Sequence, residues 1–195
     1  INILLIFLIG KLSNTNFMLI TATQTMKKEL RKKITSIIRT KLFESMYPDI
    51  DLMINNDDNM IFSNQNSITL TTTNSSVPIG AGFHWIFLID FLNSDMMRST
   101  PLRNEAFAQL KNFLSRTQHN PSTRIVVDNQ RLGTEDLSAY LVQQYTEVGL
   151  PFRRLTFPYQ FSEDFIYNAV NGAYLKTRFI STSTSTEPGR EALII

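Results

Sequence analysis

Two adjacent arginines, Arg153 and Arg154, are the residues whose chemistry stands out first in this chain. A guanidinium group carries a planar fork of donors that matches a phosphate group, and it stays charged at physiological pH. The pair follows Phe152, an aromatic residue that can anchor the chain at this point. Two interpretations are open: positive charge held rigidly toward a phosphate backbone, or ordinary solvated surface charge.

A second set of cations lies within residues 26–44, which the spacing of the apolar residues predicts to be a helix. Residues 20–45 carry seven basic and two acidic side chains, whereas residues 46–120 carry four basic and seven acidic ones. This local positive charge is typical of a protein that contacts a polyanion with a selected surface, and a solvated amphipathic helix is the alternative. The predicted nucleic-acid contacts on this helix are Lys27, Lys28, Arg31, Lys32, Lys33 and Arg39.

A capped helix between Thr134 and Gly149 is expected to position the arginine pair. Thr134 can accept a hydrogen bond from the first turn, and Gly149 suits the left-handed conformation just past a helix end. Pro151 then prevents the helix from resuming. Arg153 and Arg154 are therefore expected at the start of a new element.

The rest of the chain alternates between strand-like and helix-like patterns, so the predicted fold class is α+β. Phe83–Leu92 is almost wholly apolar and long for a strand, and we expect it to be a buried helix in which Asp90 needs a partner or a surface. Lys176 and Arg178 share one face of a predicted strand and complete the set of predicted nucleic-acid contacts. Further strands are expected at 50–54, 60–62, 67–73, 124–127 and 174–182, and further helices at 101–117 and 163–171.

The composition limits the chemistry that this chain can perform. It has 195 residues, of which 43% are hydrophobic and 18% charged, as in a globular protein. With no cysteine, the chain forms no disulfide, thiolate zinc site or cysteine nucleophile. No phosphate loop, nucleotide fingerprint, metal cluster or catalytic triad spacing is present, so we expect no enzyme, cofactor or metal, although a catalytic carboxylate pair stays open.

The chain opens with nine apolar residues, INILLIFLI. This run is too short to span a bilayer, which needs about 20 residues. Three interpretations are open: an element packed on a neighbouring protein, an internal core segment, or a targeting segment.

The order of these elements, together with four segments, resembles the bacterial-type ribosomal protein S3 family. Residues 33–73 are similar to its helix and β-hairpin, and residues 77–80 (VPIG) to the strand-to-loop step of its type II KH domain. Residues 124–154 are similar to its strand–helix–FRR segment, and residues 168–182 to the strand that continues it.

The resemblance implies a KH type II-like domain followed by a second small α/β domain. We expect an N-terminal extension over residues 1–20, a KH-like domain with an insertion over residues 21–119, and a C-terminal α/β domain over residues 121–195. The KH loop departs from the family pattern, because the glycine expected at its end is replaced by Phe83. We therefore expect no conventional single-strand clamp here.

The resemblance also implies a function. The chain would be a structural constituent of the small ribosomal subunit that binds rRNA, contacts neighbouring small-subunit proteins and lines the channel through which mRNA enters. Arg153 and Arg154 match the family's channel arginines, whereas Phe157 replaces a third basic residue. The divergent, weakly basic composition favours a mitochondrial ribosome in the matrix. A membrane-associated accessory subunit of an organellar complex is the alternative.

Overall fold

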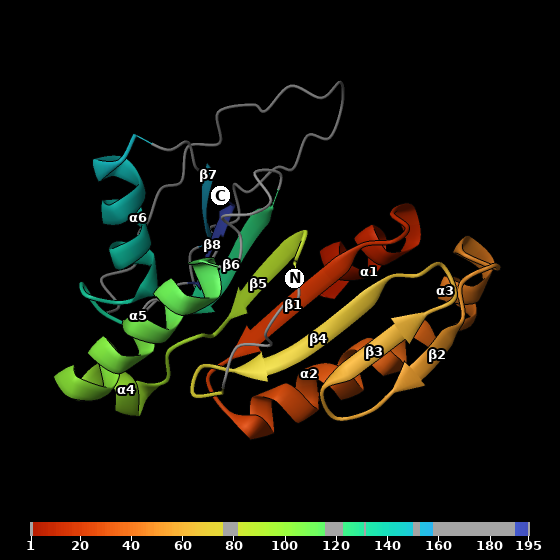
Figure 1. The fold of residues 1–195 in the computed structure, drawn as a ribbon, viewed down its shortest axis with the longest axis horizontal. Coiled ribbons are helices and arrows are strands. Elements are labelled where there is room, and N and C mark those ends of the chain that lie inside the picture. The colour runs from red at the N-terminus through yellow and green to blue at the C-terminus, as the bar shows by residue number, and fades with distance from the viewer. Residues whose placement is uncertain are drawn as a thin grey trace, which may run out of the picture.

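The computed structural model describes residues 2–75, 82–115, 123–130, 132–149, 153–157 and 190–194. The fold mixes helices and strands, as predicted. The strands in these ranges form one eight-stranded sheet in the order β2-β3-β4-β1-β5-β6-β8-β7 (Figure 1).

The centre of the sheet is parallel and its two edges are antiparallel. The parallel strands are, in sheet order, β4 (Ser67–Thr72), β1 (Asn16–Thr21), β5 (Trp85–Ile89) and β6 (Arg124–Gln130). The hairpin at one edge consists of β2 (Leu52–Asn55) and β3 (Asn59–Phe62), and the opposite edge consists of β8 (Arg190–Ile194) and β7 (Arg153–Phe157).

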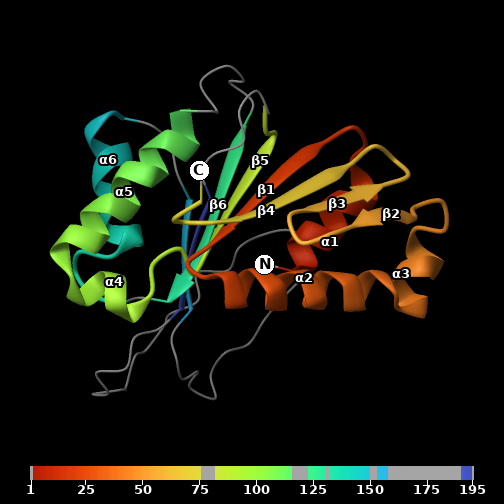
Figure 2. The same cartoon turned by 60° about the horizontal axis from the view of Figure 1, so that its bottom comes forward.

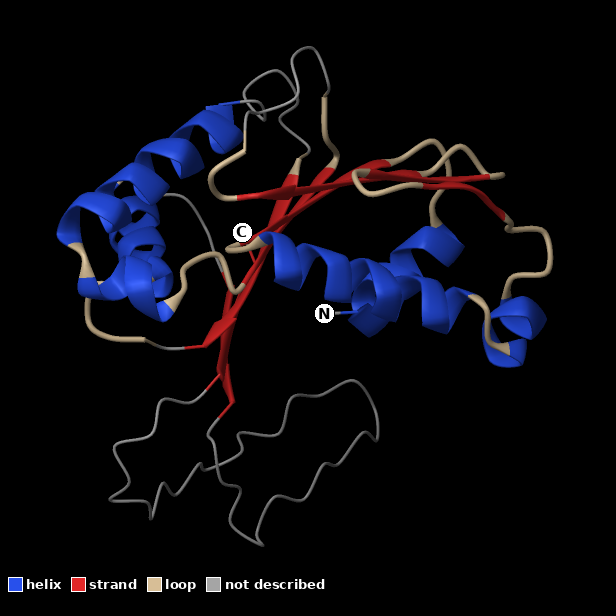
Figure 3. Ribbon diagram, turned by 90° about the horizontal axis from the view of Figure 1, so that it is seen from below, coloured by secondary structure: helices blue, strands red, loops and turns tan. Residues whose placement is uncertain are grey.

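Helices cover both faces of the sheet, so the fold has three layers (Figures 2 and 3). One face carries α1 (Asn2–Lys11), α2 (Gln24–Ile38) and α3 (Lys41–Met46), and the other carries α4 (Ser94–Arg98), α5 (Thr100–Ser115) and α6 (Leu137–Glu147). Successive side chains of a strand point to opposite faces, so Phe17 and Leu19 of β1 join the first core, whereas Met18 and Ile20 join the second.

The apolar N-terminal run forms α1 and belongs to the core. Leu5 and Ile9 are fully buried against the α2 side of the sheet, while Ile3 and Phe7 are exposed on the outer side of the helix. The structure therefore supports the interpretation of this run as an internal core segment. No helix in the described part of the chain is long and apolar enough to cross a membrane.

The prediction of a helix over Phe83–Leu92 is wrong. This segment forms β5, which is paired on both sides by parallel strands. Strands that are covered on both faces are apolar at every position, so periodicity cannot distinguish them from a buried helix. Its four residues from Ile86 to Ile89 are all buried.

The other predicted elements within the described ranges are confirmed, with shifted boundaries. The single helix expected over 26–44 is divided into α2 and α3, because Thr40 caps a new helix by accepting a hydrogen bond from the Phe43 amide at 3.2 Å. In α6 the N-cap is Asp136 and not Thr134, whereas Gly149 has the expected left-handed φ of 68°. The predicted KH loop, the helix at 163–171 and the strand at 174–182 lie outside the described residues.

Candidate functional site

The connections of the parallel strands change direction between β1 and β5. From β1 the chain crosses one face of the sheet through α2 and reaches β4, on one side of β1. From β5 it crosses the other face through α4 and α5 and reaches β6, on the far side (Figure 1). Open α/β sheets bind ligands at such a switch point, outside the carboxyl ends of the strands.

A crevice of about 350 Å³ lies at this place. Its walls are the ends of β1, β5 and β6, one side of α2 and the first residue of α1. Its volume is within the range of ordinary small-molecule sites, about 300–1,000 Å³. The polar side chains that line it are Asn2, Thr21, Glu29, Lys33, Asp90 and Asp128.

Asp90 follows β5 directly and has a left-handed backbone, with φ 43°. Its amide donates to the carbonyl oxygen of Asp128 at 2.8 Å, and its carboxylate accepts from the Gln130 amide at 3.2 Å. Aspartate and asparagine tolerate this conformation better than most residues, but it is uncommon outside glycine. The backbone and β6 together fix where the Asp90 carboxylate can lie.

Asp128 provides a second carboxylate from the neighbouring strand. It is in register with Ile89, the residue that precedes Asp90. Val126 packs in the core on the α2 face, and the two-residue period of a strand places Asp128 on that face too. Asn129 therefore points to the opposite face, where its side-chain oxygen accepts from the Ser138 hydroxyl at 3.1 Å.

Positive potential offsets part of the charge of the three lining carboxylates, which belong to Glu29, Asp90 and Asp128. Both α1 and α2 begin at this edge of the sheet, and a helix N-terminus carries the positive end of the helix dipole. Lys33 adds a full charge from α2. The side-chain oxygen of Asn2 is buried and has no hydrogen-bond partner within the described ranges. A crevice with acids on one wall and helix N-termini on another suits a ligand that carries phosphate together with a divalent cation.

The metal chemistry of the site depends on the ligand. Among the residues that the structure describes, no group of three or more acidic or histidine side chains could hold a metal ion alone. Mg²⁺ does not need such a cage, since it commonly binds through one or two carboxylates plus the phosphates of its substrate. Asp90 and Asp128 fit that smaller requirement.

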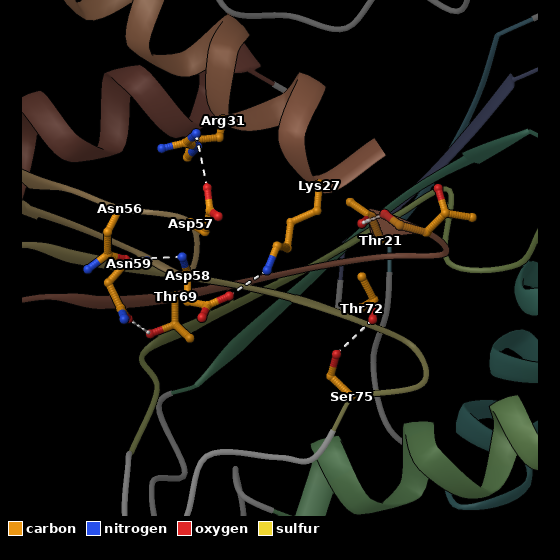
Figure 4. A network of polar contacts seen from close by, with 11 residues as sticks. Thr21, Lys27, Arg31, Asn56, Asp57, Asp58, Asn59, Thr69, Thr72 and Ser75 are labelled. Carbon is orange, nitrogen blue, oxygen red and sulfur yellow. Dashed lines mark hydrogen bonds and ion pairs between the residues drawn. The ribbon is translucent and has the colours of Figure 1, made fainter. Parts of the chain in front are cut away.

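The predicted nucleic-acid contacts of α2 have different environments. Lys27 is buried, and its ammonium group is paired with Asp58 (Figure 4). Arg31 is partly buried and is paired with Asp57 at 3.2 Å. The remaining four are exposed, and of these only Lys33 lines the crevice: Lys28, Lys32, Lys33 and Arg39.

The structure does not bring the arginine pair near the cations of α2. Arg153 and Arg154 lie in β7, in register with Ile194 and Leu193 of β8. Strands β5, β6 and β8 separate β7 from β1, against which α2 packs. Lys176 and Arg178 lie outside the described residues.

The sequence alone points to Asp90, within a predicted helix, but it does not single out Asp128. The signal that could have found it is a repeated pattern. IFLID at 86–90 and RIVVD at 124–128 are two apolar runs that each end in aspartate. Two buried parallel strands would place those aspartates at the same edge of the sheet.

Comparison of the sequence with known protein families and curated proteins identifies no relative of this chain. No protein-family model matches the chain, and a search of curated proteins found no match either. The site is therefore interpreted from its geometry.

Proposed function

We propose that this chain is a nucleotide-binding α/β domain. The phosphates of the ligand, together with Mg²⁺, would lie at the carboxyl ends of β1 and β5. The observation that carries the proposal is the crevice at the switch point of the sheet, with Asp90 and Asp128 on adjacent strands of its wall.

Four groups at the crevice have a role in this proposal. Asp90 and Asp128 would hold Mg²⁺, directly or through water, while the ligand phosphates complete the coordination. The N-terminus of α1 and the ammonium group of Lys33 would stabilise the phosphate charge. The sequence contains no glycine-rich phosphate loop, so backbone amides in the first turns of the helices, other than that of Met26, which donates to Thr23, would take the place of such a loop.

Calorimetric titration with ATP and GTP, with and without Mg²⁺, tests the proposal. We expect binding that requires Mg²⁺ and that weakens by about tenfold or more in Asp128→Asn, which removes one charge from the metal site. Asp49→Asn is the matched control, since it removes the same charge from an exposed residue that does not line the crevice. Absence of binding by the wild type, or equal affinities for the two variants, would contradict the proposal.

A second candidate is a structural role in the small ribosomal subunit, with rRNA binding through a KH type II-like region and mRNA near Arg153 and Arg154. The observation that favours it is the concentration of exposed cations on α2, which is followed by the β2–β3 hairpin. In this case a mitochondrial ribosome is the expected location.

Sedimentation separates the two candidates. A ribosomal protein would migrate with the small subunit and stay there at moderate salt, and Arg153→Glu with Arg154→Glu would slow initiation on structured messages. A chain that sediments free of ribosomes and binds Mg²⁺–nucleotide would exclude the second candidate.

A further inference from the structure

A second hollow lies on the other side of α2, between this helix and the end of β2. Its volume is about 570 Å³, and it shares no lining residue with the crevice at the carboxyl edge. Every residue that lines it is polar, and half of them are cations: Arg31, Lys32, Thr35, Ser36, Arg39 and Asn55. We call this hollow the basic groove.

Arg31 is held in one orientation at the base of the basic groove. Its guanidinium group pairs with Asp57 at 3.2 Å (Figure 4). It also donates to the Asn55 side chain at 3.5 Å. Asn55 in turn donates to the Thr35 hydroxyl at 3.2 Å. The Nε of Arg31 is buried without a partner among the described residues. A guanidinium that is already oriented loses little side-chain entropy when it binds an anion.

The cations beside Arg31 are not neutralised by any carboxylate in the described part of the chain. Lys28, Lys32 and Arg39 are exposed, and within the described ranges no carboxylate forms an ion pair with them. They extend along α2 over about 16 Å, which matches about five nucleotides along one strand of a duplex. The groove therefore has the length and the charge to follow several consecutive phosphates.

The opposite face of α2 argues against insertion of this helix into a membrane. Leu30, Ile34 and Ile38 form the apolar stripe of the helix, and all three are buried in the core. An amphipathic helix that lies in a bilayer surface inserts its apolar face among the lipids, and here that face is occupied by the core. The residues of α2 that are fully exposed to solvent are all charged or polar.

We propose that the basic groove binds the phosphodiester backbone of a nucleic acid. Lys32, Arg39 and the oriented Arg31 would contact phosphates, and the hydroxyls of Thr35 and Ser36 would add hydrogen bonds. No base-reading element borders the groove in the described part of the chain, so the contact is with the backbone and not with sequence. This site does not depend on the proposed nucleotide site, because the two have no lining residue in common.

Fluorescence anisotropy with labelled oligonucleotides tests the inference. The probes are a single-stranded RNA, a single-stranded DNA and a DNA duplex, each measured over a range of salt concentrations. We expect the double variant Lys32→Gln/Arg39→Gln to bind at least about tenfold more weakly and to lower the salt slope by about 2, one unit for each lost phosphate contact. The RNA and DNA arms show which nucleic acid is preferred.

The matched control is Arg98→Gln/Lys111→Gln. It removes the same total charge from exposed residues of α4 and α5, on the opposite face of the sheet. We expect this control to bind within about twofold of the wild type, since only non-specific charge is lost. All four substituted side chains are exposed, so both variants are expected to fold.

Equal losses in the two double variants would overturn the inference, and so would a wild-type protein that binds phosphatidylserine vesicles but no oligonucleotide. Mg²⁺–nucleotide titration of Lys32→Gln/Arg39→Gln keeps the two proposals distinct. Unchanged nucleotide affinity with weakened oligonucleotide binding supports a separate site. Loss of both activities in this variant would contradict the independence of the basic groove.

Discussion

The amide of Asp90 donates a 2.8 Å hydrogen bond to the carbonyl oxygen of Asp128, and this bond extends the β5–β6 pairing by one residue beyond the end of β5. It forms while Asp90 is in a left-handed conformation, which turns the chain away from the sheet at the edge of the crevice. The conformation that ends β5 is thus the same one that positions a carboxylate at the candidate site.

Substitutions at Asp90 are expected to separate backbone strain from charge. Asp90→Asn keeps an oxygen acceptor for the Gln130 amide and tolerates φ 43°, so we expect the free energy of unfolding to change by less than about 0.5 kcal/mol. Asp90→Ala loses the acceptor and is strained at this φ, and it is expected to cost about 1–3 kcal/mol. Urea denaturation measures both variants. Equal free energies of unfolding for the two variants would show that the left-handed conformation does not determine which residues are tolerated at position 90.

The close contact of Gly10 with Tyr47 predicts a destabilising overlap. A Cβ atom at Gly10 would collide with the Tyr47 ring, which packs between α1 and the end of α3. Alanine normally stabilises a helix relative to glycine by about 1 kcal/mol, but overpacking of a filled site costs about 1–3 kcal/mol. We therefore expect Gly10→Ala to lower the free energy of unfolding, and Tyr47→Ala in the same chain to relieve the collision.

Gly82→Ala is the control for this prediction, because no atom lies within 4 Å of the position that its Cβ would occupy. Thermal unfolding of this variant should match the wild type closely. If Gly10→Ala were equally neutral, the tight packing of α1 against Tyr47 would be disproved.

The side chain of Asp136, the N-cap of α6, is expected to stabilise the start of this helix. Its two carboxylate oxygens accept from the amides of Ala139 at 3.1 Å, Leu132 at 3.0 Å and Gly133 at 3.4 Å, and the side chain is buried. Asp136→Ala removes all three hydrogen bonds and should cost about 2 kcal/mol or more. Thr134→Ala, at the exposed residue that the sequence pattern favoured as the cap, should cost less than about 0.5 kcal/mol. The opposite order in chemical denaturation would restore Thr134 as the cap.

The ion pair between Lys27 and Asp58 is asymmetric, so its two partners should respond differently to substitution. The side chain of Lys27 is 7% exposed, whereas that of Asp58 is 67% exposed. Asp58→Ala leaves a buried ammonium group without its partner and should cost about 1–3 kcal/mol, while Lys27→Met leaves an aspartate that water can solvate and should cost less. Urea denaturation of the two variants and of their combination checks this order. A larger loss for Lys27→Met would mean that its packing, and not its charge, matters.

Much of the fold could be predicted from local patterns, and the errors have a common physical origin. The amphipathic stripe of α2, with Leu30 and Ile34 buried and Lys28 and Lys32 exposed, is visible in the sequence because one face meets water. β5 is covered on both faces, so its residues are apolar at nearly every position and carry no period. α1 also carries no period, although Ile3 and Phe7 on its outer side are exposed. Length then misled the assignment of β5, which was expected to be a helix.

The candidate site was harder to predict because tertiary structure creates it. Asp90 and Asp128 are 38 positions apart, and only the parallel pairing of β5 with β6 makes them neighbours. Lys27 shows the converse, since its charge suggests a surface contact, whereas its side chain is buried and the hairpin turn supplies its partner, Asp58. Composition reveals how many charges a segment has, but not which of them the fold neutralises.

The most direct test of the nucleotide site is an amide-resolved NMR titration of the isotope-labelled chain with Mg²⁺–ADP. At 22.4 kDa the protein is small enough for this measurement. We expect the largest shift changes at the carboxyl ends of β1, β5 and β6, centred on the amides of Thr21, Asp90 and Asp128, and we expect these changes to be lost in Asp128→Asn. Changes confined to the basic groove of α2, or no changes at saturating Mg²⁺–ADP, would contradict the proposed nucleotide site.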